Sequence, residues 1–165
     1  MRETPADLEG LQVLLDRSYR AAGPHLRSIH TEARRLSAGH VAERLQGMCL
    51  LVVATVSGDG RPFCGPVDGI FFRGSFHFGT DPRALRWRHL QRNPAVSATH
   101  LPSEAFAVTV HGRAVPVDTS AGGLREALLE VYVQRYGPEW ERFLDSGPRY
   151  ARIEADRMFA IAVSD

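Results

Sequence analysis

A run of strand-length segments between Met48 and Pro116 constrains the fold more than any other part of this sequence. The segments carry apolar residues at alternate positions or in short continuous runs, as strands with a buried face do. Tight-turn residues separate them, because Gly58-Asp59-Gly60 is a strong hairpin signal and Arg73-Gly74 marks a second turn. One helical stretch interrupts the strands. This order of elements is typical of an antiparallel β-protein.

We predict about six or seven strands that close into a small β-barrel with peripheral helices, a mainly β (α+β) fold. The strands are expected at residues 48–57, 61–72, 75–79, 95–100, 105–117, 149–153 and 158–163, with residues 154–157 joining the last two. Inside the run, Asp81 is expected to cap a helix that has Pro82 at its first position. A longer helix is expected from Asp118-Thr119 to Tyr136, with a last helical turn or two over 139–144.

The segment before the barrel is expected to be helical. Thr4-Pro5-Ala6-Asp7 combines a cap, a proline at the first helical position and an acid in the first turn. Leucines then recur at helical spacing as far as Tyr19, and residues 25–36 are expected to be partly helical. We therefore divide the chain into a helical extension, residues 1–36, and a barrel domain, residues 37–165.

Composition excludes several classes of function. The net charge of +1 across 165 residues gives no overall basic field for nucleic acid. No apolar run approaches the roughly 18 residues that span a membrane, and the N-terminus has no secretory signal pattern. Cys49 and Cys64 fall within expected strands and are expected to be reduced core residues. These features predict a cytoplasmic protein without a membrane or nucleic-acid partner.

An anion site is the main functional hypothesis that the residues themselves suggest. All twenty basic residues are arginine, and arginine grips phosphate with a bidentate fork. Thr80, Arg83 and Arg86 lie around the expected helix start, where free N–H groups and the helix dipole favour an anion. The alternative is a solvated, arginine-rich helix whose cap is taken by Asp81.

The order of these elements and motifs resembles that of a known family, the pyridoxamine 5'-phosphate oxidase-like split barrels. The resemblance covers residues 37–117 and rests on the order and spacing of four pieces. These are Ala54-Thr55-Val56 running into Gly58-Asp59-Gly60-Arg61-Pro62, then Phe78-Gly79-Thr80, then Leu90-Gln91-Arg92-Asn93-Pro94-Ala95-Val96, and Val110-His111-Gly112-Arg113-Ala114. It implies a six-stranded split barrel and a homodimer with FMN across the subunit interface.

The resemblance also implies which residues hold the cofactor. Gly65, Pro66, Val67 and Asp68 match the segment along the flavin ring, and Gly79 and Thr80 match the strand end that contacts the cofactor. Ala84, Leu85 and Arg86 match the phosphate clamp, with Arg83 standing in for its middle arginine. Gly65, Ala84 and Ala107 depart from the oxidase pattern, which has an arginine, a hydroxyl and a glutamine there.

The resemblance therefore implies a flavin- or deazaflavin-dependent oxidoreductase that acts on a small organic substrate, with FMN as the first choice of cofactor. The cofactor carries the hydride chemistry in such enzymes, and no catalytic side chain is identified. The alternative is a non-catalytic flavin- or haem-binding barrel, for which His77, His100 and His111 are the candidate haem ligands. No Cys/His pair has the spacing of a metal site.

Overall fold

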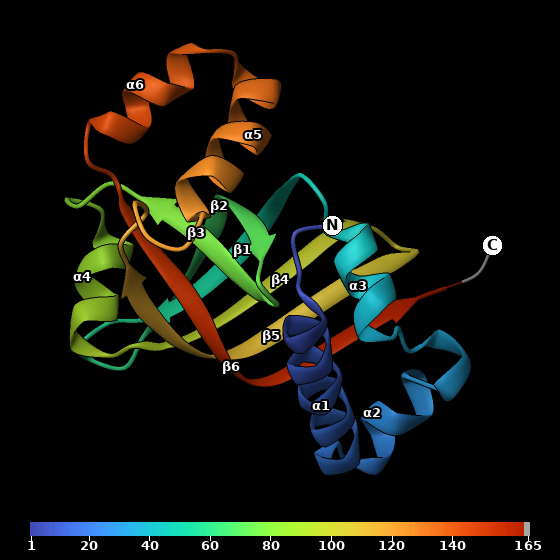
Figure 1. The fold of residues 1–165 in the computed structure, drawn as a ribbon. Coiled ribbons are helices and arrows are strands. Elements are labelled where there is room, and N and C mark those ends of the chain that lie inside the picture. The colour runs from blue at the N-terminus through green and yellow to red at the C-terminus, as the bar shows by residue number, and fades with distance from the viewer. Residues whose placement is uncertain (164–165) are drawn as a thin grey trace.

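The computed structural model describes residues 1–163 and contains a closed barrel of six antiparallel strands (Figure 1). The order around the barrel is β1-β2-β3-β6-β5-β4. The strands are β1 (Met48–Val56), β2 (Pro62–Phe72), β3 (Ser75–Thr80), β4 (Ala95–Ser103), β5 (Phe106–Val117) and β6 (Arg149–Ala162). The predicted six-stranded barrel with peripheral helices is confirmed.

Both predicted hairpin turns are present. Strands β1 and β2 pair from Met48↔Ile70 to Val56↔Pro62, with a turn closed by the Ser57 N–H donating to Arg61 O at 2.9 Å. Strands β2 and β3 are joined by Arg73 and Gly74 alone, whose φ angles are 52° and 75°. A two-residue loop with positive φ at both positions matches the right-handed twist of the strands.

The last strand corrects the prediction of two closing strands over 149–153 and 158–163. The structure has one strand of 14 residues, β6, which pairs with β5 along its length. Its register shifts between His111 and Gly112, so that one extra β6 residue, Asp156, is accommodated. A Cβ on Gly112 would lie 2.0 Å from Glu154 O, and only glycine allows this bulge. The extra residue shifts the alternation of buried and exposed side chains along β6 by one position. The sequence pattern therefore looked like two strands with a break between them.

Two helices begin later than predicted, and in both cases an aspartate side chain explains the difference. Helix α4 (Leu85–Arg92) follows a turn in which Asp81 accepts from the Arg83 N–H at 2.7 Å. Helix α5 (Leu124–Tyr136) follows a turn in which Asp118 accepts from the Ser120 N–H at 2.9 Å. Aspartate favours such local turns over the first turn of a helix. Helix α6 (Glu139–Asp145) agrees with the predicted last helical turns.

The N-terminal helices lie beside the part of the closed barrel where β3 no longer pairs with β6 (Figure 1). They are α1 (Pro5–Ala21), α2 (Pro24–Ile29), the short 3-10 turn η1 (Glu32–Arg34) and α3 (Ala38–Arg44). Strand β3 pairs with β6 only over residues 149–152. Beyond that point, Ser18 accepts from the Met158 N–H at 2.9 Å, and the Tyr19 hydroxyl accepts from the Ala160 N–H at 3.0 Å. Helix α1 therefore satisfies the backbone of β6 where the neighbouring strand ends.

Two apolar clusters form the core. The larger fills the barrel and reaches α1 and α3, and the smaller lies between α5, α6 and the outer side of the sheet. Cys49 is buried and Cys64 is exposed, so the expectation of a core cysteine is wrong for Cys64; both thiols are free. No helix within residues 1–163 combines the length and the apolar character that crossing a membrane requires.

Candidate functional site

Arg86 lies over the backbone of β2, next to the segment predicted to hold the cofactor. Its Nη2 donates to Gly65 O at 3.1 Å and to Pro66 O at 3.3 Å. Partial burial lowers the pKa of the Arg86 guanidinium. A Cβ on Gly65 would lie 3.3 Å from the same nitrogen. Gly65, which has no side chain, thus leaves the space in which the Arg86 guanidinium lies.

Arg83 does not join Arg86 at this place. Its guanidinium forms a two-point ion pair with Asp81, at 3.1 Å from Nε and 2.9 Å from Nη2, in an exposed position. Hydrogen bonds from the Arg83 side chain and backbone lower the pKa of Asp81 to about 2. The sequence placed the two arginines on one helix face, whereas Arg83 lies before the helix and is paired locally.

The other predicted clamp residues have mainly structural surroundings. Ala84 is the cap of α4 and makes no side-chain capping bond, and Leu85 is the exposed first residue of the helix. Thr80 is the last residue of β3 and pairs with Arg149. A Cβ on Gly79 would lie 2.8 Å from the Tyr150 ring, so packing against that ring accounts for the glycine.

A small pocket beside Arg86 contains a residue that the sequence reading missed, His89. The pocket has a volume of about 130 Å³ and is lined by Val53, Thr55, Phe63, Cys64, Gly65, Leu85, Arg86 and His89. The Nδ1 atom of His89 lies 3.0 Å from the Thr55 hydroxyl, and both residues are buried. His89 lines the pocket, and the printed hydrogen bond of its ring uses Nδ1. His89 follows Arg86 by three positions, and this shared helix face was the available signal.

The rest of the predicted cofactor segment divides between the two faces of β2. Val67 packs against the barrel core, and Pro66 is exposed. Asp68 points outward and accepts a hydrogen bond from the Tyr136 hydroxyl at 2.8 Å. That bond raises the pKa of Tyr136. Asp68 is therefore held by α5 rather than being free in solvent.

The candidate haem ligands are separate from one another and hydrogen-bonded. His77 is buried, its Nδ1 lies 3.1 Å from Ser75 O, and burial lowers its pKa to about 4. Nδ1 of His100 lies 2.9 Å from Leu50 O, and Nδ1 of His111 lies 2.8 Å from the Ser97 hydroxyl. The described part of the chain contains no group of three or more His, Cys, Asp or Glu side chains placed to hold a metal ion.

Comparison with known proteins identifies the family. Residues 38–164 match the family described as pyridoxamine 5'-phosphate oxidase. The chain belongs to this family. The resemblance noted from the strand and turn motifs is thereby confirmed, and the match covers all six strands of the barrel. No curated protein matches the chain in sequence.

Solved structures share the fold at low sequence identity. A conserved hypothetical protein from Mycobacterium tuberculosis is 20% identical, with a TM-score of 0.66 over 80% of this chain and 88% of its own. The haem storage protein HutZ from Vibrio cholerae is 19% identical, with a TM-score of 0.59 over 78% and 95%. A FAD-binding protein from Mesorhizobium loti is 18% identical, with a TM-score of 0.56 over 80% and 97%. The family's barrel therefore occurs in flavin-binding and haem-storage proteins.

Proposed function

We propose that this protein is a flavin-dependent oxidoreductase that binds FMN with its phosphate in the pocket beside Arg86. The observation that carries the proposal is the joint presence of Arg86 and His89 in one small pocket next to Gly65. A guanidinium and an imidazole are both donors suited to a phosphate. A bound flavin, or a deazaflavin in its place, supplies hydride transfer to or from a small organic substrate.

The size of the pocket supports a single compact group. Its volume of about 130 Å³ is equivalent to roughly four water molecules at about 30 Å³ each, and it is below the roughly 300–1,000 Å³ of pockets that hold whole ligands. The flavin ring must therefore lie outside it, and we place it along the β2 segment 65–68, in which Pro66 is exposed and Asp68 is half-buried. Burial already lowers the pKa of Arg86, so an anion in the pocket stabilises its charge.

We further propose that the protein is a homodimer formed through the outer face of β1. Leu50 and Val52 point outward there and are 52% and 49% exposed. They are paired across the sheet with Asp68 and Pro66 of β2, so the apolar surface adjoins the proposed ring position. A second copy of the chain would cover this surface and enclose the cofactor. Changing both residues to glutamate is expected to give monomer mass in light scattering and weaker FMN binding; an unchanged mass would exclude this face.

The direct test is titration of the purified protein with FMN and with a deazaflavin, followed by absorbance and fluorescence. Arg86→Gln is expected to weaken FMN binding by about 1.5–3 kcal/mol, roughly ten- to a hundredfold, because a charge-assisted contact is lost. Arg88→Gln is the matched control, since Arg88 is on the same helix, is exposed and does not line the pocket. Equal affinities for the two variants would refute the phosphate assignment.

Two variants separate a ligand role of His89 from a structural one. In His89→Gln the amide nitrogen can take the place of Nε2, the ring nitrogen that does not pair with Thr55. In His89→Asn it can take the place of Nδ1, which does pair with Thr55. If His89 binds the phosphate, the glutamine variant keeps more FMN affinity than the asparagine variant. The reverse order, with affinity following thermal stability, would make His89 a structural partner of Thr55.

The second candidate is a non-catalytic haem carrier, favoured by the fold likeness to a haem storage protein and by the exposed His111 on β5. Haemin titration distinguishes the two functions. A Soret band lost in His111→Ala, without tight FMN or deazaflavin binding to the native protein, would favour the carrier. Turnover of an electron acceptor by the FMN-loaded protein would favour the oxidoreductase.

A further inference from the structure

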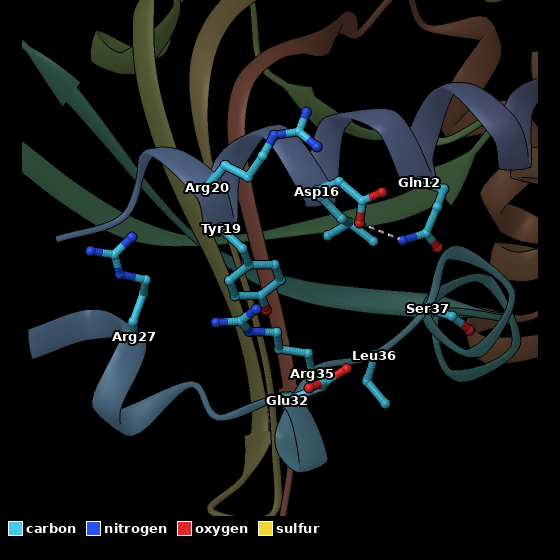
Figure 2. Close-up of a pocket in the computed structure, with 10 residues that line it drawn as sticks. Gln12, Asp16, Tyr19, Arg20, Arg27, Glu32, Arg35, Leu36 and Ser37 are labelled. Carbon is cyan, nitrogen blue, oxygen red and sulfur yellow. Dashed lines mark hydrogen bonds between the residues drawn. The ribbon is translucent and has the colours of Figure 1, made fainter. Parts of the chain in front are cut away.

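A second hollow lies away from the barrel site, among the N-terminal helices (Figure 2). Its volume is about 530 Å³, and its lining comes from α1, α2, η1 and the segment before α3. All of its lining residues fall between Gln12 and Ser37, before the part of the chain that matches the family at 38–164. The family's cofactor site therefore does not account for it.

Three arginines from three different elements line this hollow. Figure 2 shows Arg20 on α1, Arg27 on α2 and Arg35 after η1 around it. Within residues 1–163, Arg20 and Arg27 have neither an ion pair nor a side-chain hydrogen bond, although Asp16 lies one helical turn before Arg20. Uncompensated guanidinium groups around one hollow attract an anion.

Arg35 is held in place and still presents its terminal nitrogens. Its Nε donates to His30 O at 2.8 Å, and its guanidinium carbon lies 4.4 Å from the centre of the Tyr19 ring. The Tyr19 hydroxyl in turn is bonded to the backbone of Ala160. A guanidinium fixed from two sides loses less conformational entropy when it binds a carboxylate or phosphate.

The remaining lining limits the charge and chemistry of a ligand. Asp16 and Glu32 bring two carboxylates against the three arginines, so the hollow suits one or two negative charges rather than a polyanion. Asp16 already accepts from Gln12 at 2.9 Å, as the dashed line in Figure 2 shows. Of the apolar lining residues, Leu15 and Tyr19 are buried, whereas Leu36 is half-buried and offers an apolar surface.

We propose that this hollow binds a small organic acid, a carboxylate or phosphate ester with an apolar or aromatic part. Its volume lies within the roughly 300–1,000 Å³ range of small-molecule pockets. The acidic group would meet Arg20, Arg27 and Arg35, and the apolar part would lie against Leu36, the lining residue whose apolar side chain is only half-buried. Binding here would stabilise the packing of α1 on β6, because Tyr19 of α1 both lines the hollow and bonds to Ala160 of β6.

The test uses the 165-residue chain carrying Arg86→Gln, so that the barrel pocket lacks its guanidinium and contributes less to anion binding. Phenyl phosphate, benzoate, inorganic phosphate and neutral benzyl alcohol are titrated by calorimetry and by thermal unfolding. We expect one of the two organic acids to bind saturably and more tightly than inorganic phosphate or benzyl alcohol; which one binds tells the phosphate from the carboxylate class. At a concentration of about 100 Kd, the melting temperature should rise by roughly 5–10 °C.

Matched variants locate the binding. Arg20→Gln with Arg27→Gln, both exposed and unpaired, should weaken binding by roughly tenfold or more. Arg34→Gln is the control, because Arg34 lies in η1 and does not line the hollow. No saturable binding of either organic acid, equal affinity for benzyl alcohol or inorganic phosphate, or equal affinities of the paired variant and the control would each overturn the proposal. None of these outcomes bears on FMN binding, which is measured with Arg86 intact.

Discussion

Replacing Tyr19 with phenylalanine tests whether helix α1 completes the barrel. The Tyr19 hydroxyl accepts from the Ala160 N–H at 3.0 Å and donates to Ala160 O at 2.7 Å. Tyr19→Phe removes both bonds and keeps the ring that packs against Phe159. Ala160 O keeps a second donor, the Leu36 N–H at 3.1 Å, whereas the Ala160 N–H loses its acceptor.

The expected cost follows from this difference. A buried donor without a partner costs about 1–3 kcal/mol, and Ala160 is fully buried. We therefore expect unfolding free energy to fall by about 2 kcal/mol, which lowers the melting temperature by roughly 4–8 °C for a domain of this size. Tyr136→Phe is the control, because its hydroxyl bonds to Asp68 at an exposed position, and it should cost less than about 1 kcal/mol.

The assay combines urea unfolding with hydrogen exchange of single amides. In Tyr19→Phe the Ala160 amide should exchange faster than that of Val110, which belongs to the same barrel core but not to the contact with α1. If the variant unfolds like the native protein and protection at Ala160 is unchanged, α1 does not hold the edge of β6, and the reasoning fails.

Three further predictions concern the barrel. Burial lowers the pKa of His77 from 6.5 to about 4, so the unfolded chain binds more protons than the folded chain between these pH values. The free energy of unfolding should therefore fall by up to about 3 kcal/mol as the pH is lowered from 6.5 to 4. His77→Gln should reduce this loss, as measured by urea unfolding at each pH. Gly112→Ala should destabilise the fold by about 3 kcal/mol or more, because the added Cβ would clash with the backbone of β6. Gly10→Ala should stabilise it by about 0.5–1 kcal/mol, because Gly10 is an exposed residue of α1 with open space around it. An equal effect of the two variants in thermal unfolding would contradict the proposed need for glycine at the β5–β6 bulge. An alkylating reagent at pH 8 should label Cys64 and spare Cys49, whose burial raises its pKa to about 12; two labels per folded chain by mass spectrometry would contradict this.

Much of the barrel was predictable because its signals are local. Alternating apolar residues marked the first five strands, and turn residues marked both hairpins. The start of α1 was equally clear, since Thr4 and Asp7 form a reciprocal capping box within a single turn. The errors in the predicted starts of α4 and α5 also have a local cause. Asp81 and Asp118 are of a residue type that often caps helices, but here their side chains close turns before the helix begins.

The sequence by itself determined which segments are strands and helices, and the motif order that marks the family, because these depend on residues a few positions apart. Only the tertiary structure decided which side chains meet. Thr55 and His89 are 34 positions apart and share a hydrogen bond, Arg86 reaches Gly65 across 21, and Tyr19 reaches Ala160 across 141. Such contacts depend on how the strands close around the core, since burial of apolar surface is the dominant force in folding and is not specified by any one polar pair. The pocket beside Arg86 is a product of that closure, whereas the N-terminal hollow is formed where α1, α2 and η1 pack together.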